Sequence, residues 1–207
     1  MKFKIIPNFI SPEEQIEIIE FSKNKPKFDI QNEHIKKIND YTKGWSILYD
    51  FSKTAISKNV SKFQGDATQI ESAPSIFHNL SQRISDSLSI DKNNVFFQYI
   101  VLGATGQVYP HYDAGTPGYI TYKCNIAVDG PKQDFIQVDK KTISFNNLDL
   151  YCFEANFYKH WMKASENPRI HLSYGFLIPY KTLGYDENSP RVKLSNRIWR
   201  AFINGKI

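Results

Sequence analysis

The residues of this chain best suited to chemistry are His111 and Asp113, which are separated by one residue just before a turn rich in Gly and Pro. In an extended segment, residues two apart point to the same side, so the imidazole and the carboxylate can converge on one point. A second histidine, His160, follows in the strand-like run FYKHWM. Two histidines and one carboxylate are the ligand set that suits non-haem Fe(II) and leaves open positions for substrate and oxygen. The sequence therefore predicts a metal site formed by these three side chains.

A cationic side chain, Arg169, lies nine positions after His160 and opens the run RIHLSYGFLIP. Arg169, His171 and Ser173 share one face of this expected strand because strand side chains alternate. A guanidinium at this position can bind a carboxylate through two parallel hydrogen bonds. The pattern predicts a site for a bidentate 2-oxo acid beside the metal. His171 fits either a position in the pocket wall or a hydrogen bond within the barrel.

The elements that must position these residues begin with a region dominated by two helices. Ser11 can cap a helix, Pro12 suits its first position, and Glu14 completes a capping box, which predicts a helix to about Asn24. Pro74 opens a second helix with apolar residues at helical spacing. The remaining segments are expected to be strands at 3–10 and 44–51 and loops at 25–43 and 52–73.

From residue 94 onward, short β-rich runs are separated by turns that contain Gly, Pro and Asn. The runs are VFFQYIVL, YITYKCNIAV, DFIQV, TISF, DLYCF, FYKHWM and RIHLSYGFLI. Two helices followed by such strands predict an α+β chain built on a sandwich or barrel. In the second run, Thr121, Lys123 and Asn125 share one face and are further candidates for the pocket wall.

These motifs together resemble the Fe(II)/2-oxoglutarate-dependent dioxygenases. The features that carry the resemblance are HYD at 111–113, KHW around His160 and PRIHLSYGF from Pro168. The stretch FFQYIVLGATGQVYPHYDAG and the opening KIIPNFISPEEQIEIIEF resemble the prolyl-hydroxylase-like branch. The stretch DLYCFEANFYKHWMKASENPRIHL is similar to the aspartyl/asparaginyl hydroxylase branch. The resemblance covers roughly residues 1–22 and 94–180.

The resemblance implies a double-stranded β-helix (jelly roll) with supporting N-terminal helices. It implies one domain over residues 1–207, with an N-terminal strand and helix layer at 1–93, a jelly-roll core at 94–180 and a C-terminal tail or helix at 181–207. His111, Asp113 and His160 would ligate Fe(II), and Arg169 would bind the distal carboxylate of 2-oxoglutarate. The family's usual Arg-x-Ser pair is not intact, because His171 stands two positions after Arg169.

The implied activity is hydroxylation of an amino-acid side chain, peptidyl or free, with O2 consumed and succinate and CO2 released. Asp113 favours this chemistry, because related halogenases have a small residue at that position and bind chloride there. Three tyrosines flank the His-x-Asp motif and are the expected substrate contacts: Tyr109, Tyr112 and Tyr119. The co-substrate contacts expected besides Arg169 are His171, Ser173, Thr121, Lys123 and Asn125.

Two other functions fit the same motifs: oxidative demethylation of nucleic acid, and ligand binding by a catalytically silent jelly roll. The net charge of +5 is spread along the chain with acidic residues among the basic ones, which does not favour a nucleic-acid partner. We expect a peptide or amino-acid substrate, no membrane span, a monomer or homodimer, and a cytoplasmic location. The last expectation rests on the two cysteines and the lack of a signal-peptide pattern.

The densest basic cluster lies in the C-terminal tail, where four cations alternate with apolar residues. This pattern suits an amphipathic helix that docks on its own domain about as well as it suits a partner site. The cations are Arg191, Lys193, Arg197 and Arg200.

Overall fold

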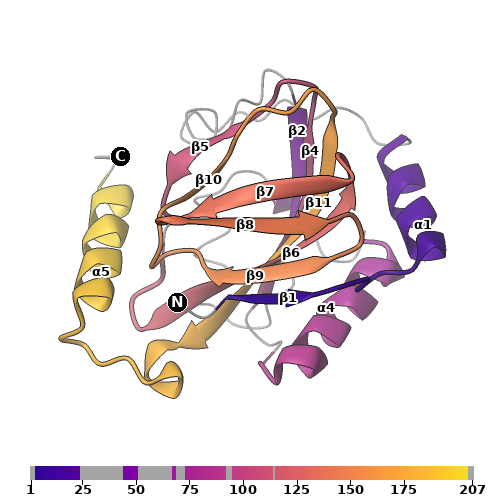
Figure 1. Ribbon diagram of the computed structural model, residues 1–207. Helices are drawn as coiled ribbons and strands as arrows, with labels where there is room; N and C mark the ends of the chain where they lie inside the picture. Colours follow the sequence, from indigo (N-terminus) through magenta and orange to yellow (C-terminus); the bar gives the residue numbers. More distant parts are fainter. Residues whose placement is uncertain are drawn as a thin grey trace.

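The computed structural model describes residues 3–23, 44–50, 67–68, 73–91, 95–113 and 115–204. Two β-sheets face each other, and helices lie beside them (Figure 1). The larger sheet has seven strands, which are in spatial order β1 (Lys4–Ile6), β9 (Leu150–Glu154), β6 (Tyr119–Asp129), β11 (Arg169–Pro179), β4 (Val95–Leu102), β2 (Gly44–Asp50) and β3 (Ala67–Thr68). The smaller sheet has four, in the order β5 (Val108–His111), β10 (His160–Met162), β7 (Gln133–Val138) and β8 (Lys141–Asn146).

The described helices are N-terminal and C-terminal to this strand-rich core. They are α1 (Pro12–Lys23), α4 (Ser75–Leu88), the short 3-10 helix η3 (Tyr180–Leu183) and α5 (Pro190–Ile203). Figure 1 places α1 and α4 on one side of the sheets and α5 on the other. Among the described residues, no helix is both long and apolar enough to cross a membrane.

From β4 onward the chain crosses repeatedly between the two sheets. It passes from β4 to β5, from β6 to the β7–β8 hairpin, and from β9 to β10, before β11 returns between β6 and β4. This alternation winds one chain around a common interior and is the connectivity of a jelly roll. The predicted α+β jelly roll with supporting N-terminal helices is therefore confirmed.

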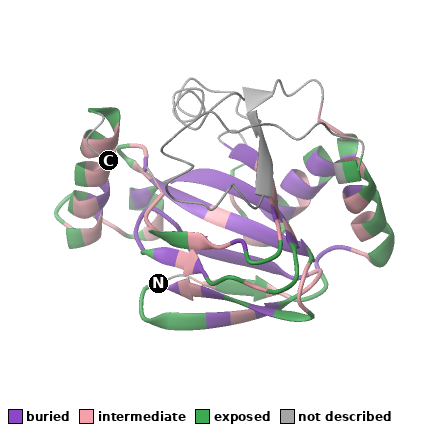
Figure 2. Ribbon diagram, turned by 90° about the horizontal axis from the view of Figure 1, so that it is seen from above, coloured by how far each residue is buried: buried purple, intermediate pink, exposed green. Residues whose placement is uncertain are grey.

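The central strands of the larger sheet are buried on both faces, and Figure 2 shows them mostly purple with a few pink positions. Its outer face packs apolar side chains, such as Cys124 and Ile126, against the helices α1 and α4. Its inner face packs residues such as Tyr151 and Phe153 against the smaller sheet. Because side chains alternate along a strand, Lys123 and Asn125 lie on the inner face between the outward residues of β6.

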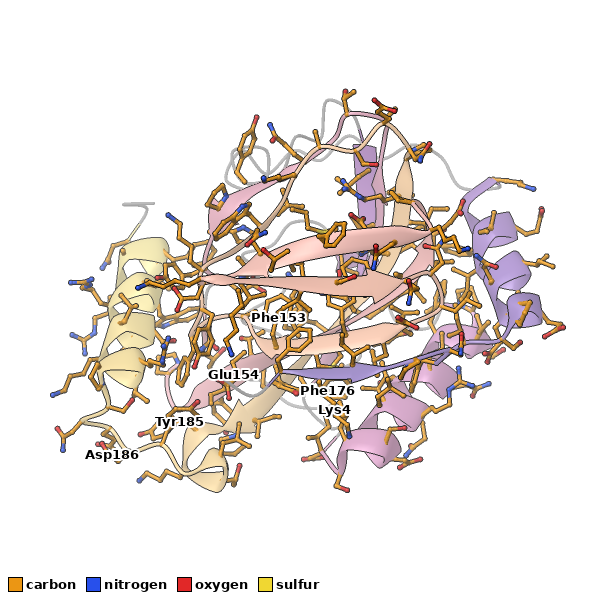
Figure 3. All side chains as sticks on the ribbon, viewed as in Figure 1. Lys4, Phe153, Glu154, Phe176, Tyr185 and Asp186 are labelled. Atoms are coloured by element: carbon orange, nitrogen blue, oxygen red, sulfur yellow. The ribbon has the colours of Figure 1, made fainter. Side chains whose placement is uncertain are left out.

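The same alternation on β9 separates two neighbours. Phe153 lies among the inner-face residues, whereas Glu154 is oriented toward Tyr185 (Figure 3). The Tyr185 hydroxyl donates to Glu154 Oε1 at 3.2 Å and Oε2 at 3.0 Å. A fully buried carboxylate is thereby satisfied outside the barrel interior.

The first helix begins as its sequence predicts. The Glu14 backbone N–H donates to Ser11 Oγ at 3.2 Å, and the Ser11 N–H donates to Glu14 Oε2 at 2.9 Å, which is a capping box. The strand expected over 3–10 is shorter, because the chain turns after Ile6 and Asn8 adopts a φ of +48°. Of the expected loops, residues 25–43, 52–66 and 69–72 lie outside the described residues, as do Asn24 and Phe51 at the ends of the expected helix and strand.

One short strand, β3, lies within the segment expected to be a loop at 52–73. It pairs in parallel with β2, with Leu48 opposite Ala67. Two residues of strand formed by a distant pairing leave no periodic signal in the sequence, so the pattern could not predict it.

The tail forms the helix α5, and one of its faces docks on its own domain. Val192 and Ser195 are buried. Asn156 donates to Ser195 Oγ at 2.9 Å, and Arg191 donates to the Phe157 carbonyl at 2.9 Å. The guanidinium of Arg191 also lies 3.8 Å from the centre of the Tyr158 ring. The docking interpretation of the tail therefore holds for this face.

Gly175 of β11 provides a test of the packing inside the large sheet. A Cβ at Gly175 would lie 2.0 Å from Phe96 Cζ, because the Phe96 ring covers the glycine from the neighbouring strand. We expect Gly175→Ala to lower the free energy of unfolding by about 1–3 kcal/mol through overpacking, measured by urea denaturation. In a Phe96→Leu background the same change should cost clearly less. An equal cost in both backgrounds would remove the Phe96 ring as the cause.

Candidate metal site

The strand pairing brings the two predicted histidine ligands together. His111 ends β5 and His160 begins β10, and the two residues are direct cross-strand partners. Asp113 follows β5, and its backbone N–H donates to the Ala155 carbonyl at 3.2 Å. Asp113 Oδ1 lies 3.2 Å from His111 Nε2 and 3.4 Å from His160 Nε2. The three possible ligand atoms all lie within 4.8 Å of one another.

Both imidazoles are oriented by the backbone. His111 Nδ1 lies 2.7 Å from the Tyr109 carbonyl, and His160 Nδ1 lies 3.1 Å from the Tyr158 carbonyl. A carbonyl only accepts, so Nδ1 of each ring carries the hydrogen and Nε2 keeps its lone pair. His160 Nε2 is buried and has no hydrogen-bond partner among the described residues. A divalent metal ion would satisfy this nitrogen, so the donor set fits such an ion.

The pKa values of Asp113 and His160 favour the protonation states that bind a cation. Burial by itself would raise the pKa of Asp113, but the ammonium of Lys123, followed by the proximity of the two imidazoles, holds it well below its usual range. Burial, followed by the proximity of His111, lowers the pKa of His160 to about 4. At neutral pH the carboxylate is therefore charged and His160 is neutral, which are the forms that bind metal.

A cavity of about 70 Å³ adjoins the histidines between the two sheets. Three residues predicted as co-substrate contacts line it: Lys123, Asn125 and His171. Ser173 and Thr121 lie on the same inner faces of β11 and β6, and their buried hydroxyl oxygens have no hydrogen-bond partner in the part of the chain that the structure describes. The sequence reasoning thus placed five residues on the inner faces of two adjacent strands. Their role as co-substrate contacts stays a prediction.

Arg169 lies apart from this cavity. Its Nε donates to Asp134 Oδ2 at 2.6 Å and its Nη2 to Asp134 Oδ1 at 3.1 Å, while Nη1 donates to the Gly106 carbonyl at 3.3 Å. Arg169 lines a different cavity, which it shares with Asp134 and Lys163. The predicted two-pronged contact with a carboxylate exists, but its carboxylate belongs to the protein.

The three tyrosines proposed as substrate contacts surround the motif. Tyr109 is 42% exposed, and Tyr112 and Tyr119 are half-buried. The backbone carbonyls of two of them have structural roles, since Tyr109 orients His111 and Tyr119 accepts a hydrogen bond from Asn156. Contact with a substrate stays a prediction for all three.

Two residues of this interior were not singled out by sequence reasoning. The Tyr151 hydroxyl lies 3.0 Å from His171 Nδ1 and its ring stacks on Phe145, so Tyr151 fixes the imidazole within the cavity wall. Asp134 neutralises Arg169. The alternation of buried and exposed positions in QDFIQV could have placed Asp134 inward, where a carboxylate requires a partner.

No family model matches the chain, and no curated protein matches it in sequence. Solved structures resemble it in fold. A 2OG-Fe(II) oxygenase family protein from Burkholderia pseudomallei matches with a TM-score of 0.57 at 11% identity, covering 84% of each chain. A collagen prolyl hydroxylase from Paramecium bursaria Chlorella virus-1, in complex with 2OG, matches with a TM-score of 0.55 at 10% identity, covering 86% of this chain and 96% of the other.

A third similar structure is a prolyl hydroxylase from Trichoplax adhaerens in complex with a peptide fragment of hypoxia inducible factor. It matches with a TM-score of 0.52 at 12% identity, covering 89% of this chain and 87% of the other. Identities this low establish the fold alone. The chain has the double-stranded β-helix fold of these oxygenases, and the histidine and aspartate side chains meet inside it.

His171 makes the stability of the metal-free protein sensitive to acid. Burial lowers its pKa from 6.5 to about 4. Below pH 6.5 the unfolded chain therefore binds a proton that the folded chain does not. Stability is expected to fall from pH 6.5 to about 4, by up to about 3 kcal/mol, and to show no contribution from His171 above pH 7.

Denaturant titrations of the metal-free protein between pH 4 and 7.5 measure this dependence. His171→Asn keeps a hydrogen-bonding side chain beside Tyr151 and removes the titrating group, so its stability should depend less steeply on pH. Equal slopes for the wild type and the variant would contradict the role of His171. His160 titrates in both proteins and cancels in the comparison.

Proposed function

We propose that this chain is an Fe(II)- and 2-oxoglutarate-dependent oxygenase that hydroxylates an amino-acid side chain, peptidyl or free. The observation that carries the proposal is the convergence of His111, Asp113 and His160 beside a cavity inside the jelly roll. The buried Nε2 of His160, with no hydrogen-bond partner among the described residues, is the clearest sign that a cation belongs there. The likeness in fold to enzymes named for this chemistry supports the same interpretation.

The ligand geometry suits an ion that must also accept other ligands. Two residues come from paired strands and the third from the turn after β5, so all three approach from the same end of the smaller sheet. Three protein ligands would leave the remaining coordination positions of Fe(II) for co-substrate and oxygen. Bound Fe(II) would supply activation of O2, with the 2-oxo acid as the source of two electrons and with succinate and CO2 as products.

The chain's own contribution is to bind, orient and exclude water. The backbone carbonyls fix both imidazole rings, which keeps the metal in one position relative to the substrate. Apolar side chains complete the cavity wall and limit the access of water to the reacting groups. They include Ile100, Val108, Ile136, Phe153 and Met162.

A peptidyl substrate is the form that the comparisons support most directly. One similar structure is a prolyl hydroxylase in complex with a peptide fragment. The three tyrosines around the His-x-Asp motif, above all the exposed Tyr109, are the described aromatic side chains that we propose contact such a substrate. A cytoplasmic location and a monomeric or homodimeric state remain predictions.

The proposal is tested by the production of succinate from 2-oxoglutarate by the purified protein, measured by mass spectrometry with and without Fe(II). We expect Fe(II)-dependent succinate formation, and its loss to background in His111→Ala, Asp113→Ala and His160→Ala. These variants should also lose Mn(II) binding, because each removes one ligand.

The matched control is His78→Ala, which removes an exposed histidine on α4 and should leave both readouts unchanged. Full Mn(II) binding and succinate formation by the three ligand variants would refute the metal assignment. A wild type that binds Mn(II) but forms no succinate would instead refute the oxygenase activity.

A further inference from the structure

We propose that Lys123, and not Arg169, binds the second carboxylate of the 2-oxo acid co-substrate. The inference rests on the proposed function, since it assigns the anchor for that function's co-substrate. It departs from the expectation drawn from the position of Arg169 in the sequence. The departure follows from how the two cations are partnered in the barrel interior.

Arg169 already has a carboxylate partner, and three of its five N–H donors are used within the protein. Its Nε and Nη2 are occupied by the two oxygens of Asp134, and its Nη1 donates to Gly106. The side chains of Arg169 and Asp134 are 4% and 9% exposed. Breaking a buried ion pair by removing one partner leaves an uncompensated buried charge, which is strongly unfavourable. A dicarboxylate that used Arg169 would have to displace Asp134 against that cost.

Lys123 has both access and spare donors. It lines the metal cavity together with His111 and His160, whereas Arg169 does not. Its ammonium forms one ion pair with a described residue, at 3.0 Å to Asp113 Oδ2. An ammonium has three N–H donors, so two remain for an oxygen-bearing ligand. The side chain is 16% exposed, so it is partly open to the cavity rather than sealed in the core.

The surroundings of Lys123 contain polar groups that lack partners. Asn125 lies two residues along the same face of β6, and Ser173 is its cross-strand neighbour on β11. The hydroxyl oxygens of Ser173 and Thr121 are buried and have no hydrogen-bond partner among the described residues. Of the polar residues near Lys123, Asn125 lines the metal cavity, so its amide is a further donor for an oxygen-rich ligand in that cavity.

The charges around the cavity also favour Lys123 as the anchor of the second carboxylate. Arg169 and Asp134 cancel, and Lys123 and Asp113 cancel. A divalent metal ion then leaves two uncompensated positive charges inside the barrel. Because buried charges require partners, the co-substrate that fits is a dianion with one carboxylate beside the metal and the other beside Lys123.

The test compares 2-oxoglutarate with 2-oxopentanoate, which has the same chain length and lacks the second carboxylate. Binding of each acid to the Mn(II)-loaded protein is measured by calorimetry without oxygen. The wild type should prefer 2-oxoglutarate, and Lys123→Met should lose about 10- to 100-fold of that preference, the value of one charge-assisted hydrogen bond. Lys123→Arg, which keeps the charge, should retain most of it.

The matched control replaces the other cation with its partner. Arg169→Met combined with Asp134→Leu exchanges a buried ion pair for apolar side chains, a change that proteins often tolerate. This double variant should keep the preference for 2-oxoglutarate. Loss of the preference in the double variant, together with its retention in Lys123→Met, would overturn the assignment.

Two further outcomes are distinguishable. If the Mn(II)-loaded wild type binds neither acid, the proposed function itself fails and the assignment fails with it. If Lys123→Met no longer binds Mn(II), the lysine acts by holding Asp113 in place, and its assignment as a co-substrate anchor is wrong. We expect Mn(II) binding by this variant to be at least as tight as in the wild type, because a cation near the metal has been removed.

Discussion

The pairing of β5 with β10 is the constraint on which the site depends. It sets His111 directly opposite His160 with ring centres 4.3 Å apart. Side chains alternate along a strand, so a slip of one residue would move either imidazole to the outer face. As a pair, these two strands have a neighbouring strand on one side only. The neighbour is β7, which pairs with β10, and β5 is the edge of the smaller sheet. The register of a few residues at one edge therefore determines whether a metal site exists.

The support for this edge comes from distant parts of the chain. The turn that carries Asp113 continues into Gly115, where a Cβ would lie 2.3 Å from Asn156 and 2.6 Å from Ser195. Asn156 accepts from the Thr121 N–H at 2.9 Å and donates to Ser195, so β6, the turn after β9 and α5 meet at one amide. The helix α5 thus braces the loop that follows Asp113, a candidate metal ligand. This gives a structural reason for a C-terminal helix beside the ligand end of the barrel (Figure 1).

Sequence reasoning succeeded where the interactions involve residues that are close together in the chain. Local signals were sufficient for the capping box at Ser11, for the strands after residue 94 and for the spacing that places His111 and Asp113 on one side. The short-range alternation on β6 also placed Lys123 and Asn125 correctly on the inner face. These features are encoded within a few residues, where periodicity and turn chemistry are readable.

The partner of Arg169 was not readable in this way. Asp134 lies 35 residues earlier and on the opposite sheet, so only the closure of the jelly roll brings the two together. A motif records that a cation stands at a given position, and it does not record which anion the fold supplies. The same holds for Tyr151, whose contact with His171 depends on the packing between strands rather than on spacing.

Two ion pairs, one buried and one partly open to the metal cavity, divide the barrel interior into parts with different roles. The pair of Arg169 and Asp134 joins β11 of the larger sheet to β7 of the smaller sheet and satisfies both charges internally. The pair of Lys123 and Asp113 shares its carboxylate with the imidazoles of the metal site. A cation bound at Asp113 would weaken the attraction between that carboxylate and Lys123, because the cation and the ammonium would interact with the same negative charge. Under the proposed function, a metal ion at Asp113 would free Lys123 for an incoming anion, so the charge arrangement favours binding of the metal before the co-substrate.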